Sequence, residues 1–239
     1  MRLQMQRRDP LRVAQHPLWQ EVESRLKERL APIRVDESAR MNHGIAEFGR
    51  AMNPSPGSLS MIWSVGLLAY LSNPTTTFGF WRQALKPGGL LMFATLGPDS
   101  FRALALALGD PAQSVHVAGY PDMHDLGDAL IHSRFADPVM DAEWVTLSYA
   151  TAESALKDLR LLGGNALMGR PSGLRGRAWR ERVLKAFEAL QHDEKLHLQV
   201  EMVFGHAWRA EEKPANPRQE RTKDQIQPIR WSGRAPEKP

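Results

Sequence analysis

The chain has 239 residues, 42% of them hydrophobic, and a formal net charge of +4. This length suits one ordinary globular domain with appendages. The absence of cysteine excludes disulfides, thiolate nucleophiles and cysteine-ligated metal centres, and it fits a reducing, cytoplasmic location. No zinc-finger or aromatic–basic pattern supports a nucleic-acid partner, and no apolar run is long enough to span a bilayer, so we expect neither nucleic acid nor membrane as a partner.

The first unit, residues 1–57, is predicted to be a helical N-terminal segment. Residues 1–15 carry little to bury, so we expect them to be disordered. An amphipathic helix is predicted over residues 17–30, because apolar side chains recur there at four-residue steps: Leu18, Val22, Leu26 and Leu30. Residues 32–56 are short of apolar residues and predict no central strand, only one short helix.

The second unit, residues 58–208, begins with a strand–helix–strand pattern. Two buried strands are predicted, separated by a helix and the turn Lys86-Pro87-Gly88-Gly89, and this order favours a parallel pair. Alternating patterns predict two further strands, and helical patterns fill the space between them. The strands are expected at 59–63, 90–95, 143–149 and 196–208, and the helices at 75–85, 101–108, 123–132, 152–162 and 176–190. Residues 209–239 are rich in proline and charge and are predicted to be a disordered tail.

Several short strings of this unit occur in a fixed order, at residues 85–89, 97–100, 122–128, 135–141 and 203–208. This series resembles the malonyl–acyl carrier protein O-methyltransferases of biotin synthesis, which are class I S-adenosylmethionine-dependent methyltransferases. The resemblance implies an α/β fold, a Rossmann-like class I methyltransferase sheet with a helical lid inserted at about residues 152–191. It also implies S-adenosylmethionine as the cofactor and an acyl carrier protein as a partner.

One part of the family pattern is missing from this sequence. In the family, a glycine-rich loop lets backbone N–H groups approach the cofactor and an acidic residue binds its ribose. Here no two glycines are two positions apart, so no G-x-G loop exists. The roughly twenty residues between Val35 and Pro54 are too few for two strands, a helix and that loop. We therefore interpret the sheet as truncated, with the cofactor-binding front half deleted, and expect no cofactor in the isolated chain.

Two sets of residues are candidates for a remaining site. Ser64 and Gly66 follow the strand whose loop, in the family, touches the methionine end of the cofactor; a plain helix start is the alternative. The densest positive run in the chain is Arg170, Arg175, Arg177, Arg180, Arg182 and Lys185. Of these, Arg175, Arg177 and Arg180 are the candidate contacts for a carrier protein or substrate, and a solvated helical face is the alternative.

A metal centre is not expected. Asp122, His124 and Asp125 lie close together in sequence, but acidic residues before an apolar helix are typical of N-caps, and their spacing matches no standard ligand pattern. His206 lies in a predicted strand, where a packed histidine is favoured over a catalytic base.

Three functions remain open, so the sequence does not decide whether the chain is an enzyme. The first is a non-catalytic methyltransferase-like protein that binds a carrier protein or a partner enzyme. The second is an active S-adenosylmethionine-dependent O-methyltransferase of biotin biosynthesis whose site is completed by a partner. The third is a decayed gene product without a role.

A sheet of about four strands that begins near Ser58 would expose an apolar edge. Residues 17–52, a second copy of the chain or a partner chain should therefore cover it.

Overall fold

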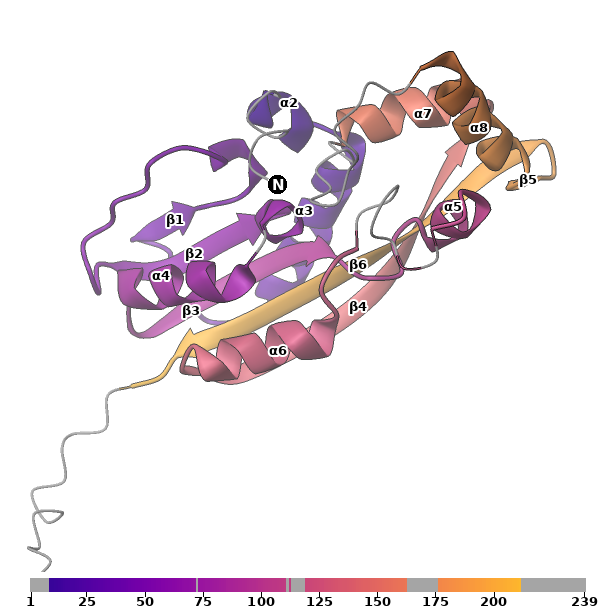
Figure 1. The fold of residues 1–239 in the computed structure, drawn as a ribbon. Coiled ribbons are helices and arrows are strands. Elements are labelled where there is room, and N and C mark those ends of the chain that lie inside the picture. The colour runs from indigo at the N-terminus through magenta and orange to yellow at the C-terminus, as the bar shows by residue number, and fades with distance from the viewer. Residues whose placement is uncertain (1–8, 72, 111, 113–118, 163–175, 212–239) are drawn as a thin grey trace, which may run out of the picture.

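The computed structural model describes residues 9–71, 73–110, 112, 119–162 and 176–211. They form one six-stranded sheet with helices packed against it, which confirms the α/β class (Figure 1). The helices are α2 (Pro10–Ala14), α3 (Pro17–Leu30), η1 (Ile45–Glu47), η2 (Leu67–Tyr70), α4 (Pro74–Ala84), α5 (Arg102–Ala107), α6 (Met123–His132), α7 (Ala152–Leu161) and α8 (Arg177–Glu188). The strands are β1 (Arg40–Asn42), β2 (Leu59–Val65), β3 (Leu85–Leu96), β4 (Phe135–Tyr149), β5 (Gln191–His192) and β6 (Lys195–Arg209).

The main path of the sheet runs β1-β2-β3-β6-β4, and β5 pairs with β6. β1, β2 and β3 are parallel, whereas β6 is antiparallel to both β3 and β4. The two central strands β2 and β3 are buried almost throughout, as expected for strands covered on both faces. β4 lies at the end of the path, and its residues are mostly half-buried or exposed.

Residues 32–56 contain no central strand, as predicted, but they do contribute an edge strand that the sequence did not predict. Arg40–Asn42 forms β1, which pairs with β2 in the register Arg40↔Met61, Met41↔Ile62 and Asn42↔Trp63. Only Met41 of its three residues is buried, so no apolar pattern marks the strand in the sequence. The sheet therefore does not begin near Ser58, and residues of this chain's own N-terminal segment cover that edge of β2.

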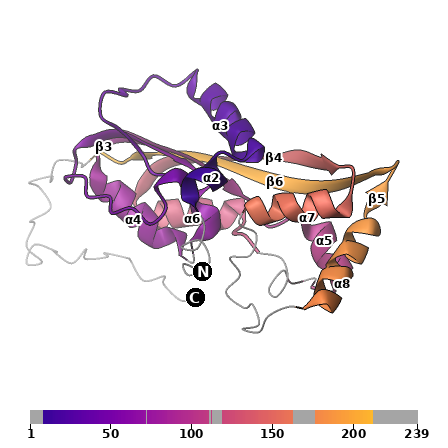
Figure 2. The ribbon, with the colours of Figure 1, turned by 90° about the horizontal axis from the view of Figure 1, so that it is seen from above.

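Helices cover the two faces of the parallel part of the sheet (Figure 2). On one face α3 buries Leu18, Trp19, Val22 and Leu26, which confirms the predicted helix and its apolar stripe. On the opposite face α4 and α6 pack their apolar side chains around Phe93. The helices α5, α7 and α8 gather at the far end of the long β4–β6 ribbon (Figure 1).

Other predictions need correction. Residues 10–14, expected to be disordered, form α2, which Asp9 caps and in which Val13 is buried. β4 begins at Phe135, well before the predicted residue 143, and the Lys-Pro-Gly-Gly turn lies inside the start of β3. The predicted tail is described only as far as residue 211, and Arg170 and Arg175 lie outside the described residues. No helix in the described part of the chain is both long and apolar enough to cross a membrane.

Candidate functional site

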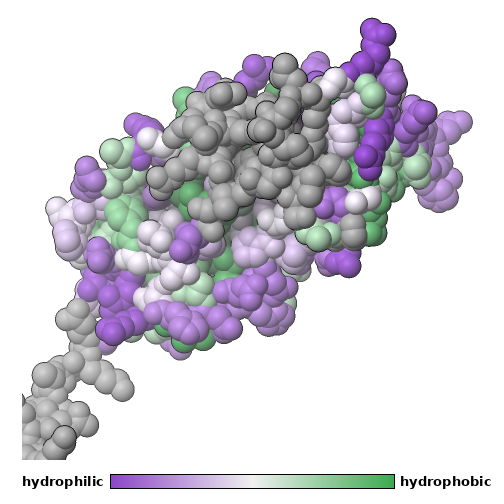
Figure 3. Space-filling view, viewed as in Figure 1, coloured by the Kyte–Doolittle hydropathy of each residue, from purple (hydrophilic) through white to green (hydrophobic). Residues whose placement is uncertain are grey.

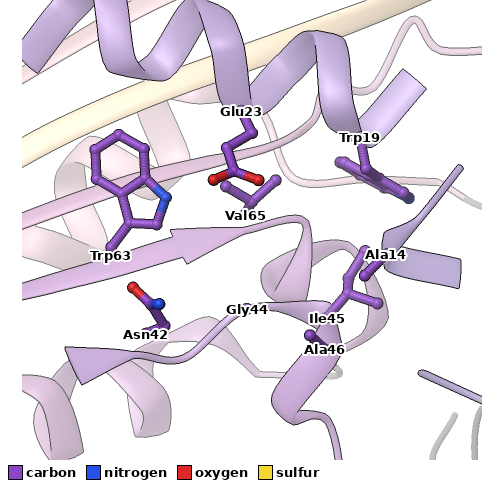
Figure 4. A pocket seen from close by; sticks show the side chains of 9 residues that line it. All are labelled: Ala14, Trp19, Glu23, Asn42, Gly44, Ile45, Ala46, Trp63 and Val65. Atoms are coloured by element: carbon purple, nitrogen blue, oxygen red, sulfur yellow. The ribbon is translucent and has the colours of Figure 1, made fainter. Parts of the chain in front are cut away.

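The carboxyl ends of β1 and β2 form the natural candidate site, because ligands of open α/β sheets bind beyond the carboxyl ends of parallel strands. β1 leads through His43 and Gly44 into η1, and β2 leads through Gly66 into η2. A pocket of about 110 Å³ lies between these segments and α3 (Figure 4). It is lined by Ala14, Trp19, Glu23, Asn42, Gly44, Ile45, Ala46, Trp63 and Val65.

Backbone N–H groups in and after the loop that follows β1 donate hydrogen bonds to acceptors within the protein. The N–H of Gly44 donates to the Glu47 carboxylate at 2.8 Å, and the N–H of Glu47 donates to the Gly44 carbonyl at 3.2 Å. The N–H of His43 donates to the Trp63 carbonyl at 2.9 Å, which continues the β1–β2 ladder. Gly44 is also tightly packed, since a Cβ there would lie 2.9 Å from the Val65 carbonyl oxygen. The Gly44 N–H is thus turned inward to Glu47, and Gly44 itself lies against β2.

Gly66, one of the two predicted cofactor residues, lies against side chains of the N-terminal segment. Its φ of +72° requires glycine, and a Cβ would lie 2.3 Å from Ile45 Cδ1 and 2.9 Å from a Trp19 ring carbon. Its N–H donates to the Ala94 carbonyl at 2.8 Å. The space above Gly66 is therefore filled by Ile45 and Trp19.

Ser64, the other predicted residue, lies away from the pocket. Side chains alternate along a strand, so Ser64 lies on the opposite face of β2 from Trp63 and Val65, which line the pocket. It is fully buried, and its hydroxyl has no hydrogen-bond partner among the described residues. A ligand in this pocket therefore meets Val65 rather than Ser64.

The sequence did not single out Trp19, Glu23 or Trp63 as site residues. The indole N–H groups of Trp19 and Trp63 are buried and have no hydrogen-bond partner within the described residues. The carboxylate of Glu23 pairs with Lys27 at 3.0 Å. Both tryptophans lie inside apolar stretches of predicted elements, where the pattern indicates core packing and gives no sign of a pocket.

The described residues do not fit the nucleoside cofactor that this fold family implies. Ligand pockets of that class span about 300–1,000 Å³, and the pocket here holds about 110 Å³. Its lining is largely apolar, and the N–H groups of His43, Gly44 and Glu47 in and after the loop that follows β1 are bonded within the protein.

Burial lowers the pKa of two histidines, His43 directly after β1 and His206 in β6. His43 Nδ1 accepts a hydrogen bond from Trp81 Nε1 at 2.8 Å, and burial lowers the pKa of His43. Burial also lowers the pKa of His206. His206 lines a separate hollow of about 280 Å³ between α3 and the sheet, where Arg29 stacks 3.8 Å above the Phe204 ring. No carboxylate pairs with His206 in the described part of the chain, so packing remains the favoured interpretation.

The charged residues of α8 lie on a helix anchored by its apolar side. Leu184 and Phe187 are buried, as predicted, whereas Arg177 and Arg180 are exposed. Arg182 is held within the protein by a hydrogen bond that it donates to the Leu108 carbonyl at 2.6 Å. Only Arg177 and Arg180 of the predicted arginine contacts can therefore be placed, on the exposed side of α8.

Asp122 is the N-cap of α6, as predicted, and accepts from the His124 N–H at 2.7 Å. Within the ranges that the structure describes, no three His, Asp or Glu side chains converge as a metal site would require.

The chain is similar in sequence to several bacterial proteins that share one name. The chain is 42% identical over 159 residues to a Laribacter hongkongensis protein named malonyl-[acyl-carrier protein] O-methyltransferase, covering 66% of this chain and 54% of the relative. A Gallionella capsiferriformans protein of the same name is 41% identical over 160 residues, covering 66% and 55%. The chain thus spans about half the length of the curated relatives it matches. No family model matches it.

The fold is that of a Rossmann-like class I methyltransferase. The crystal structure of a putative methyltransferase from Bacillus halodurans superposes with a TM-score of 0.50, covering 78% of this chain and 99% of that one at 10% identity. At that identity the likeness concerns the fold alone.

Proposed function

We propose that this chain is a methyltransferase-like protein that binds an acyl carrier protein or a partner enzyme and transfers no methyl group on its own. The observation that carries the proposal is a hydrogen bond inside the loop after β1. Its Gly44 N–H is bonded to Glu47 at the place where a class I enzyme offers backbone donors to its cofactor.

The chemistry explains why this loop matters. A carboxylate acceptor is already ionised near neutral pH, so methyl transfer to it depends mainly on aligning the oxygen, the methyl carbon and the sulfur. That alignment requires a firmly held cofactor, and micromolar affinity corresponds to about 8 kcal/mol of binding free energy. A small, largely apolar pocket beside a loop whose Gly44 N–H is internally bonded offers few groups that could supply this free energy.

The binding role draws on sequence similarity and on α8. The relatives are named for a substrate carried on an acyl carrier protein, and the family resemblance implies that this partner is strongly acidic. Arg177 and Arg180 are exposed on α8 and form no ion pair with any described residue. Their positive charges are therefore available to an acidic partner.

Calorimetric titration with S-adenosylmethionine and with S-adenosylhomocysteine tests the proposal. We expect no stoichiometric binding to the isolated chain, with the full-length Laribacter relative as the positive control. A stoichiometric complex of micromolar affinity would contradict the proposal and favour the active O-methyltransferase. In that case Gly66→Ala should abolish binding if Gly66 is a cofactor residue. Gly79→Ala in α4, where a Cβ meets nothing within 4 Å, is the matched control.

A further inference from the structure

The outer edge of β4 is open along its second half. β4 pairs with β6 on one side, and among the described strands none pairs on the other. Seen from above, β4 lies beside β6, and no further described strand lies beyond it (Figure 2). The helix α7 contacts β4 through its side chains, as when Tyr149 Oη donates to Asp158 at 2.6 Å. An open strand edge presents unpaired N–H and C=O groups to any strand that can align with it.

The first half of β4 carries the features that normally block strand addition. Asp137 has a φ of +48°, Pro138 follows it, and the register shifts between Ala136 and Val139. Bulges and prolines twist an edge away from incoming strands and remove a donor. An added strand is thus excluded from this half.

The second half lacks every such feature. Residues 144–149 read Trp-Val-Thr-Leu-Ser-Tyr, with no proline, glycine or charge. Such a segment has high β-propensity and is prone to pair edge to edge. The nearest acidic side chain, Glu143, is ion-paired with Arg25 and Arg29, which offsets its charge.

The side chains along this half also leave apolar surface uncovered. Trp144 is 53% exposed, and it is the one tryptophan among the large hydrophobic side chains that are exposed in the described residues. Figure 3 shows the hydropathy of one face of the molecule. Val145 and Leu147 lie on the other face of the strand, where they are only partly buried against the core. A strand added here would cover apolar atoms on both faces as well as the backbone.

We infer that a second copy of this chain adds to this edge, forming a symmetric dimer in which two β4 strands pair antiparallel about a two-fold axis at Thr146. A two-fold contact uses one surface twice, so it needs a segment that complements itself. This register places Val145 opposite the partner's Leu147 and Trp144 opposite the partner's Ser148. It keeps side chains of like orientation on the same face, and it places no acidic residue opposite another.

The lack of cysteine allows a direct test. Thr146→Cys introduces the only thiol of the chain at the axis. Directly opposed residues of antiparallel strands have Cα atoms about 4.5–5.5 Å apart, which lies within the range of about 4.4–6.8 Å that a disulfide spans. We expect oxidised glutathione to convert this variant to a covalent dimer.

Gln199→Cys is the matched control. Gln199 lies opposite Thr146 on β6, is exposed, and accepts a hydrogen bond from Thr146 Oγ1 at 3.2 Å. Across the axis two such residues would be about 14 Å apart, three strand spacings, so no disulfide should form between them. Light scattering of the unmodified chain should give a mass that rises with concentration towards the dimer. Thr146→Lys should hold the mass at the monomer, whereas Gln199→Lys should not.

Three results would overturn the inference. One is a monomer mass at every concentration, with no cross-link in Thr146→Cys. Another is equal cross-linking of the two cysteine variants, which would indicate random collision. The third is a dimer that Thr146→Lys leaves intact, which would place the contact elsewhere.

Discussion

The docking of α3 on the sheet can be measured with one pair of leucine substitutions. Leu18 is 2% exposed in α3, whereas Leu11 is 57% exposed in the neighbouring helix α2. Replacing a buried leucine by alanine costs about 2–5 kcal/mol, from lost transfer free energy and the cavity left behind. Leu18→Ala should therefore lower the free energy of unfolding by about 3 kcal/mol and the Tm by about 10 °C for a chain of this size. Leu11→Ala should change the free energy of unfolding by about 0.5 kcal/mol or less.

Guanidinium unfolding followed by tryptophan fluorescence measures both variants. The samples are compared at one protein concentration, because self-association adds to apparent stability. The slope of the free energy of unfolding against denaturant concentration should be the same in both variants, since both expose the same surface on unfolding. If Leu18→Ala lowered the free energy of unfolding by less than about 1 kcal/mol, the reasoning would be refuted, because truncating a buried leucine in a docked helix should cost at least about 2 kcal/mol.

Two further predictions concern acid sensitivity and the basic helix. Because burial lowers the pKa of His43, the unfolded chain takes up a proton near pH 6.5 before the folded chain does. Stability should thus be level above that pH and fall as the pH drops below it. Urea midpoints between pH 8 and pH 5 should show a shallower fall for His43→Gln, and an unchanged fall would count against the assignment. Reversing Arg177 and Arg180 to glutamate should slow association with an acidic acyl carrier protein and weaken its salt dependence while leaving the Tm nearly unchanged. Arg12→Glu on α2 changes the net charge as much as Arg177→Glu alone, so these two single variants form the charge-matched comparison. Equal binding by both would leave the α8 arginines as solvated surface.

The sequence predicted those elements whose burial follows a clear pattern. Residues 90–95, apolar except for Thr95, lie in β3, and the alternating residues 196–208 lie in β6. The strand β1 was missed because its pairing is set by the neighbouring β2, and a single buried Met41 gives no period. The early start of β4 was missed because Pro138 argues against a strand, which an edge position tolerates.

The helix α2 could have been predicted, since Asp9 before Pro10 is a standard helix start. At the candidate site, the missing G-x-G loop is a property of the sequence alone. The hydrogen bond from the Gly44 N–H to the Glu47 carboxylate could not be predicted in the same way, because it depends on the turn of η1, which brings Glu47 back to Gly44. The hollow beside His206 is likewise formed by α3, β3, β4 and β6, which are distant in sequence.

The strand order β1-β2-β3-β6-β4 also has a consequence for synthesis on the ribosome. β6 is the last strand to be made, yet it lies between β3 and β4, and it is the sole strand partner of β4 among the described strands. The nascent chain therefore carries β4 with both edges bare until residues 195–209 have emerged, and such non-local pairing is slow. During that interval the segment Trp144–Tyr149 is an aggregation hazard at each ribosome. The chain should thus depend more on chaperones while it is being made than the stability of its finished fold would suggest.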